Sequence, residues 1–187
     1  MRLKRTEWEV RNVSVNIARQ MVEEFHYAGS ASNTYTYLHG LFPVGSFWEA
    51  DCVGVAWWIP PTKGAAVNTY PKNWQGVLAL SRLVVTPGGP GNSCSFLIGA
   101  SMRLIDRQRW PCLLTYADTW QDHSGGIYKA TNWQQLEDTI PQRVYTLNGR
   151  LFSRKRGPRT YTHSEMIAMG ARLEGRFSKH KFVHYPK

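Results

Sequence analysis

The 187-residue sequence lacks several features that would assign it to a membrane or to an oxidising compartment. No apolar run approaches the roughly 20 residues of a membrane-spanning helix, and the basic N-terminus lacks the apolar stretch of a signal peptide. Cysteine is scarce, because only Cys52, Cys94 and Cys112 occur, widely spaced and odd in number. We therefore expect a cytoplasmic protein with reduced thiols and no membrane contact.

Several well-known catalytic motifs are also absent. The sequence contains no G-x-S-x-G, no GKS or GKT phosphate loop, no H-E-x-x-H and no P-C-x-x-C. Their absence argues against hydrolases with a nucleophile elbow, P-loop nucleotidases, zincins and zinc-dependent deaminases.

Acidic residues are rare in the last fifth of the chain. Residues 150–187 contain ten Lys or Arg and two acids, Glu165 and Glu174, which gives this segment +8 of the total net charge of +10. Aromatic residues are interleaved with the basic ones. This pattern favours a surface that contacts nucleic acid over a merely soluble basic tail.

Hydrophobic residues make up 42% of the chain and charged residues 19%, which indicates one globular domain over residues 1–187. Strands and helices alternate, so we expect an α/β or α+β three-layer domain, with a central mixed sheet flanked by helices. Strands are predicted at 35–42, 52–59, 78–85, 112–117, 133–138 and 181–185, a hairpin at 143–153, and helices after Ser14, from Ser95, at 127–132 and at 163–174. Residues 60–76 have no periodicity and are predicted to form a lid-like loop.

The chain is organised around residues 78–108. Leu78–Val85 reads as a strand covered on both faces, and Thr86–Gly91 (TPGGPG) cannot continue it. The following helix has apolar positions at helical spacing. A glycine-rich loop before a helix N-terminus can bind an anion, because unpaired N–H groups and the helix dipole favour phosphate. An ordinary tight turn explains the same residues equally well.

Two charged residues belong to otherwise apolar strands. Arg82 either faces an anionic ligand or holds a carboxylate such as Asp118, because a buried guanidinium is costly unless paired. Asp118 ends a strand, where α/β sheets often present catalytic side chains, although it could simply cap the next turn. With His26 and His123 it could also form a two-histidine, one-carboxylate metal site, although the spacing gives no ligand signature.

Two hydroxyl groups lie near predicted helix starts. Ser95 could contact a phosphate or a thioester, or it could be a helix cap along with its neighbours. Tyr128 follows Gly125-Gly126, where a phenol could act as a general acid or pack as an aromatic side chain.

Several short motifs together resemble one family. They are His26–Ser30 (HYAGS), Leu80–Val85 (LSRLVV), Asn92–Ser95 (NSCS), Tyr116–Asp118 (YAD), Gly125–Ala130 (GGIYKA) with Asn132-Trp133, and Lys179–Phe182 (KHKF). In order and spacing they resemble the Mom family of bacteriophage DNA-modification proteins, a branch of the GNAT acyltransferase superfamily, over about residues 13–185.

The resemblance implies a GNAT-like acyl-CoA N-acyltransferase fold with a basic C-terminal extension, whose glycine loop holds the pyrophosphate of acetyl-CoA. The implied catalytic set is His26, Tyr27, Arg82, Ser95, Asp118 and Tyr128, and the implied cofactor-binding set is Val84, Val85, Gly88, Gly89, Gly91, Asn92 and Ser93. An association of the family with iron implies a metal near His26, Tyr27 and Asp118. The loop departs from the GNAT pattern Arg/Gln-x-x-Gly-x-Gly/Ala at Pro90, which lacks an N–H donor.

The resemblance also implies the substrate, adenine in double-stranded phage DNA, whose exocyclic nitrogen receives an acetamido (carbamoylmethyl) group that protects against host restriction. A stacked, paired base must be flipped out, so aromatic side chains and backbone cations are expected. Backbone contacts are expected from Arg154, Lys155, Arg156, Arg159, Lys179 and Lys181. The candidates for stacking are Tyr27, Trp57, Trp58, Trp74 and Trp120, and the alternative for several of them is a place in the core. An acetyltransferase for small amines or proteins, and a non-catalytic DNA-binding protein, are the alternatives, and the oligomeric state, including a homodimer, stays open.

Overall fold

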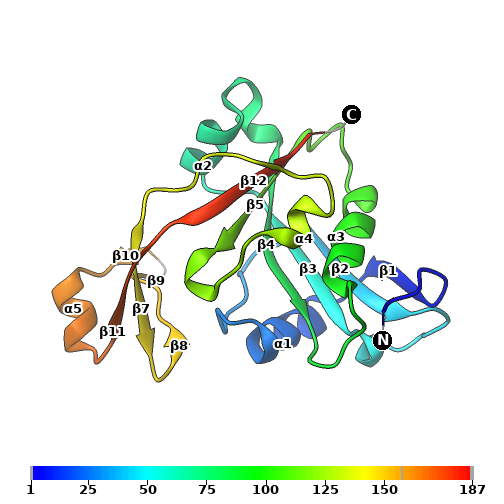
Figure 1. The fold of residues 1–187 in the computed structure, drawn as a ribbon, viewed down its shortest axis with the longest axis horizontal. Helices are drawn as coiled ribbons and strands as arrows, with labels where there is room; N and C mark the ends of the chain where they lie inside the picture. The colour runs from blue at the N-terminus through cyan, green and yellow to red at the C-terminus, as the bar shows by residue number, and fades with distance from the viewer. Residues whose placement is uncertain (1, 157, 186–187) are drawn as a thin grey trace.

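The computed structural model describes residues 2–156 and 158–185. Its centre is a seven-stranded sheet in the order β1-β2-β3-β4-β5-β12-β6 (Figure 1). All neighbouring strands are antiparallel except β4 and β5, which are parallel. The strands of this sheet are β1 (Trp8–Asn12), β2 (Tyr37–Pro43), β3 (Gly54–Ile59), β4 (Val77–Val85), β5 (Cys112–Asp118), β6 (Gln134–Gln135) and β12 (Lys179–His184).

Helices cover both faces of the central sheet, which confirms the expected three-layer arrangement. On one face α3 (Ser93–Leu104) packs Leu97 and Ile98 onto the sheet, next to α4 (Gly126–Lys129). On the other face α1 (Val15–Phe25) packs Met21 and Val22. Short 3-10 segments occur at η1 (Glu49–Asp51), η2 (Pro71–Gly76) and η3 (Thr119–Gln121).

Trp57 and Trp58 are adjacent in β3 and belong to the cores on opposite faces of the sheet. Both side chains are fully buried. The expectation that they stack on DNA bases is therefore wrong, because a residue with no exposed surface cannot contact a base without local unfolding.

The segment expected to be a lid contains a helix instead. Thr62 caps α2 (Lys63–Thr69) by accepting a hydrogen bond from the backbone N–H of Ala65, and Ala66 and Thr69 are buried. A helix of seven residues shows too little periodicity to be read from sequence. Tertiary contacts, rather than an apolar repeat, hold this helix against the sheet.

The helix expected over residues 163–174 is only half as long as predicted. A capping box between Thr162 and Glu165 starts α5 (His163–Ala168), and Gly170 with a φ of +83° follows its end. Glycine reaches this left-handed conformation without steric cost. The remaining residues form β11 (Arg172–Phe177).

Residues 142–177 build a second, smaller unit at the left of Figure 1. A three-stranded sheet has the order β11-β7-β8, with β7 (Gln142–Leu147) and β8 (Arg150–Leu151), and the predicted hairpin turn lies at Asn148-Gly149. A two-stranded ribbon of β9 (Lys155–Arg156) and β10 (Arg159–Thr160) adjoins it. Tyr145, Phe152, Met166 and Ala171 form its own apolar cluster.

The chain then returns to the central sheet as β12, which pairs with β5 on one side and β6 on the other. The basic C-terminal segment is therefore an integral part of the fold rather than an appended tail. Within the described residues, no helix combines the length and the hydropathy needed to traverse a bilayer.

Candidate active site

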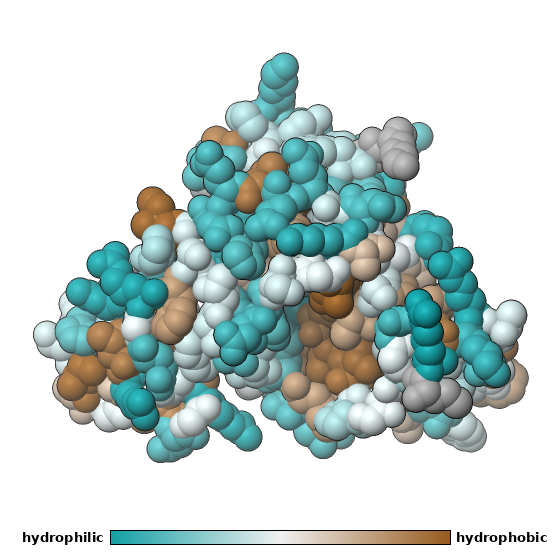
Figure 2. All heavy atoms as spheres, viewed as in Figure 1, coloured by the Kyte–Doolittle hydropathy of each residue, from teal (hydrophilic) through white to brown (hydrophobic). Residues whose placement is uncertain are grey.

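The candidate active site lies where the parallel strands β4 and β5 separate. They pair only over Val77–Ala79 and Cys112–Leu114. In β4 the register to β3 shifts between Leu80 and Arg82, which is a β-bulge and bends the strand. Beyond the paired residues, side chains of both strands line a cavity of about 470 Å³. Figure 2 shows a hollow with an apolar floor on the side of the molecule that faces the viewer.

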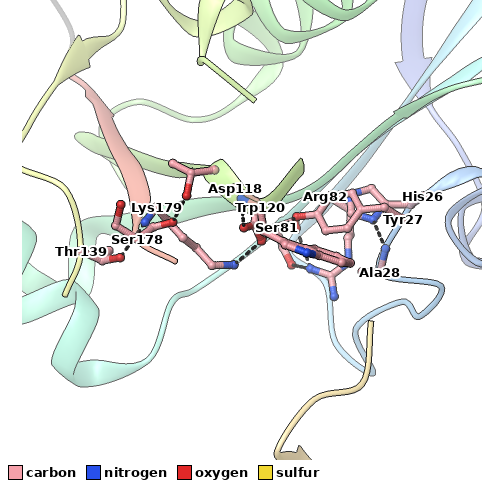
Figure 3. Close-up of polar contacts among 11 residues, drawn as sticks. His26, Tyr27, Ala28, Ser81, Arg82, Asp118, Trp120, Thr139, Ser178 and Lys179 are labelled. Atoms are coloured by element: carbon pink, nitrogen blue, oxygen red, sulfur yellow. Dashed lines mark hydrogen bonds and ion pairs between the residues drawn. The ribbon is translucent and has the colours of Figure 1, made fainter. Parts of the chain in front are cut away.

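Asp118, the last residue of β5, is buried at one end of this region. Its Oδ1 accepts a hydrogen bond from the backbone N–H of Trp120 at 3.4 Å. Its Oδ2 accepts from Lys179 Nζ at 2.9 Å and from the Tyr27 hydroxyl at 3.4 Å (Figure 3). One oxygen therefore caps η3, which confirms the capping interpretation, and the other contacts an ammonium and a phenol; the catalytic interpretation stays a prediction.

His26 and Tyr27 follow the end of α1 and stack with ring centroids 4.4 Å apart. Burial, with smaller contributions from Arg82 and His123, lowers the pKa of His26 to about 4, so the imidazole is neutral at physiological pH. Its Nδ1 accepts a hydrogen bond from the backbone N–H of Ala28 at 3.1 Å. Burial, and then the Asp118 carboxylate, raise the pKa of Tyr27, so its phenol stays protonated.

Arg82 reaches into the same cavity from β4 (Figure 3). Its Nε donates to the Ser30 carbonyl at 3.1 Å and its Nη1 to the Ser81 carbonyl at 2.8 Å. No carboxylate among the described residues forms an ion pair with it; Asp118 is paired with Lys179 instead. The interpretation that Arg82 pairs with Asp118 is therefore wrong. The other interpretation, that Arg82 faces an anionic ligand, stays a prediction.

Tyr128 lies on α4 and is buried, and burial raises the pKa of its phenol. It also lines the cavity of about 470 Å³. Gly125 before this helix has a φ of +73°, and a Cβ there would lie 2.2 Å from a ring carbon of Phe182. Only glycine therefore allows α4 to approach β12 this closely.

The loop between β4 and α3 leads into a second cavity of about 380 Å³. Its lining includes the expected cofactor residues Val85, Asn92 and Ser93, whereas Val84 belongs to the core and Gly88, Gly89 and Gly91 do not line it. The Ser95 hydroxyl donates to the Asn92 carbonyl at 3.0 Å, and Ser95 lines this second cavity but not the first. Cys94, which no sequence signal selected, lines both cavities.

A third cavity, of about 730 Å³, continues this path beyond Ser95 and Ala130. Its basic lining residues are Arg2, Arg5, Arg103 and Arg107. The Nε and Nη1 atoms of Arg107 are buried without a hydrogen-bond partner among the described residues. The sequence did not reveal this cluster, because its arginines come from the N-terminus and from two separate positions around α3.

The side chains expected to bind iron do not form a metal site. In the part of the chain that the structure describes, no three His, Cys, Asp or Glu side chains lie together as a metal site would require. Asp118 is already paired with the Lys179 ammonium, and His26 Nδ1 accepts a backbone hydrogen bond. The residues present do not fit a metal ion.

Only some of the basic residues expected to contact DNA line the same cleft. Arg154, Lys155 and Lys179 line a large cleft of about 930 Å³ that Asp118 also lines. Arg159 forms an ion pair with Glu165, and Lys181 Nζ donates to the Asn68 carbonyl at 3.5 Å. The side chain of Arg156 lies outside the described part of the structure.

The architecture places the chain in the GNAT acyltransferase fold. Similar solved structures include an N-acetyltransferase from Staphylococcus aureus Mu50 (10% identity, TM-score 0.57, 96% of this chain and 99% of that chain). Others are Arabidopsis thaliana NAA60 in complex with acetyl-CoA (8%, 0.58, 95% and 98%) and spermidine N-acetyltransferase from Vibrio cholerae in complex with CoA and spermine (7%, 0.54, 96% and 96%). At such identities the likeness shows the fold alone.

The family is defined by a separate match. Residues 7–185 match the Mom protein family, and the chain belongs to this family. Among curated protein sequences there is no match.

Proposed function

We propose that this chain is a transferase that modifies the exocyclic amino group of adenine in DNA. The expected cofactor is acetyl-CoA, and the expected added group is the acetamido group that the sequence resemblance implies. The amide nitrogen of that group needs a second donor, because an acetyl group contains no nitrogen. Family membership and the acyltransferase fold support the proposal. The observation that carries it is the position of Asp118, which lines the basic cleft and contacts Tyr27 of the β4–β5 cavity.

The three connected cavities suit a long donor that carries phosphates. The first shares Cys94, Gly126 and Ile127 with the second, and the second shares Asn92, Ser95 and Ala130 with the third. The first-turn N–H groups of α3 have no acceptor within the helix and favour a phosphate. The arginine cluster adds positive charge, and Arg107 offers two buried, unpartnered donors. These residues fit acetyl-CoA even though Pro90 offers no N–H. When bound, acetyl-CoA would supply an acyl carbon activated by its thioester.

Side chains of the first cavity, together with the adjoining Asp118, can exchange the protons that acyl transfer requires. An adenine amino group is a poor nucleophile, because its lone pair is conjugated with the ring. Attack on a thioester carbonyl releases one proton from nitrogen, which the Asp118 carboxylate can accept. The departing thiolate needs one proton, which the protonated Tyr128 can supply. Arg82 supplies positive charge to stabilise the developing oxyanion.

The acetamido product requires a different bond, because its CH2 carbon is joined to nitrogen, whereas acyl transfer joins the carbonyl carbon. The mass of the modified nucleoside therefore distinguishes the two outcomes. We propose that the modification protects phage DNA from host restriction, as the resemblance implies.

The test is nucleoside mass spectrometry of plasmid DNA from cells that express the chain, beside an Asp118→Ala control. A heavier deoxyadenosine found only with the intact chain would support the proposal, and its mass would identify the group. Unmodified DNA together with acetylation of spermine or a peptide by the purified protein would favour the small-amine or protein acetyltransferase. DNA binding that persists in the Asp118→Ala variant, without any product, would favour a non-catalytic protein.

A further inference from the structure

A cleft of about 930 Å³ lies between the two sheets and is strongly basic. It is lined by residues of β5 and β12 on one side and of β7, β8 and β11 on the other. Its charged lining residues are the cations Arg143, Arg154, Lys155, Arg176 and Lys179 and one acid, Asp118. Because Asp118 is already paired with Lys179, the other four cations face the cleft with no acid opposite them.

Two of these cations are arranged in a way that the fold alone does not favour. Arg143 on β7 and Arg176 on β11 are direct cross-strand partners. Like charges placed directly opposite one another destabilise a sheet. Neither forms an ion pair with a described acid, and the printed contact of Arg176 is a donation from Nη2 to the Pro141 carbonyl at 3.4 Å. An anion between the two guanidinium groups would turn this repulsion into attraction.

The shape and the remaining lining residues of the cleft suggest what kind of anion it binds. A single phosphate would not need about 930 Å³. Of its aromatic lining residues, Tyr116 and Phe177 are partly exposed, whereas Tyr145 and Phe152 belong to the buried cluster of the smaller unit. Cations that follow a backbone and aromatic rings that can stack on bases are the combination used to hold a nucleic-acid strand.

The cleft also leads to the reaction centre. Asp118 and Tyr116 line it, and Tyr116 lines the β4–β5 cavity as well. A strand in the cleft can therefore present one flipped base to Asp118 while its phosphates stay with the arginines.

We propose that Arg143 and Arg176 bind the phosphodiester backbone of the DNA strand that carries the target adenosine. This inference rests on the proposed function and adds two residues to the expected DNA contacts. Arg143 precedes the basic segment 150–187, and Arg176 lies within that segment. Arg154 and Lys155 extend the same contact along the cleft.

The test compares Arg143→Gln/Arg176→Gln with wild type and with Arg172→Gln. Arg172 lies on β11 with Arg176, its side chain is 81% exposed, it pairs with Glu174 at 3.8 Å and it does not line the cleft. Arg172→Gln therefore controls for the loss of one cation from this strand outside the cleft. Binding of a fluorescent, adenine-containing duplex is measured against salt concentration, and modification of the same duplex is followed by nucleoside mass spectrometry. Arg143→Lys/Arg176→Lys keeps the charge and should restore most of the binding.

We expect the double glutamine variant to flatten the slope of log K against log salt by about two, and to raise KM more than it lowers kcat. Its thermal stability should not fall, because a like-charge pair has been removed. If the wild-type protein makes product but the double glutamine variant has the same salt dependence and KM as Arg172→Gln, the cleft proposal is overturned and the proposed function is not. Wild-type binding that depends on both arginines, without any product, would support the cleft and overturn the proposed function.

Discussion

Asp118→Asn separates a chemical role of this residue from a structural one. Asparagine preserves the shape of the side chain, and its Oδ1 can still accept the hydrogen bond from the Trp120 N–H. It cannot accept a proton from an amino group. Removing a general base typically slows a reaction by about 100- to 10,000-fold, so we expect a loss of kcat in that range with DNA affinity nearly unchanged.

The expected effect on stability is much smaller. The substitution leaves Lys179 without its partner, but 45% of the Lys179 side chain is exposed, so water can solvate the ammonium. A pair with one solvated partner contributes up to about 1 kcal/mol, which corresponds to a fall in Tm of about 2–4 °C for a chain of this size.

Asp138→Asn is the matched control, because Asp138 pairs with His180 on the same strand β12 and lines none of the cavities described above. Single-turnover modification of a duplex oligonucleotide gives the rate, and thermal unfolding gives the stability. A rate for Asp118→Asn within about tenfold of the control would refute the general-base role and leave Asp118 as a cap.

Three further predictions concern buried groups. Burial lowers the pKa of His39 from 6.5 to about 4. Between these pH values the unfolded chain binds one more proton than the folded chain, so stability falls as the pH falls. His39→Asn should therefore reduce the difference in Tm between pH 7 and pH 5. Gly125→Ala should cost about 1–3 kcal/mol more in urea unfolding than Gly149→Ala, since both glycines have similar positive φ values but only Gly125 abuts Phe182; equal costs would show that the ring moves aside freely. Tyr128→Phe should lower kcat by about 100-fold or more with little change in KM, and an unchanged kcat would assign Tyr128 to packing alone.

The sequence predicted the central strands well because they are apolar runs buried on both faces, as β4 and β5 show. It missed α2, which has too few residues for a period, and it extended α5 through Gly170, whose positive φ is invisible in a hydropathy pattern. The resemblance selected His26, Tyr27, Arg82, Asp118 and Tyr128. All but Asp118 line the β4–β5 cavity, and Asp118 contacts Tyr27 from the neighbouring cleft. Ser95 lies apart, because it lines the neighbouring cavity and its hydroxyl donates to the Asn92 carbonyl.

The Lys179–Asp118 pair could not be predicted, because it depends on the antiparallel register that places these two residues opposite each other in β12 and β5. That register has a mechanical consequence. Only Phe177 and Ser178 separate Arg176, in the cleft, from Lys179, at the reaction centre. This connector is held firmly, since the Ser178 carbonyl accepts from Thr119 Oγ1 at 2.8 Å, and Lys179 exchanges two hydrogen bonds with Thr139. A backbone phosphate bound at Arg176 is therefore held close to Asp118 by a span of four residues, of which only Ser178 lies outside a strand, and this short span can set which nucleotide reaches the carboxylate.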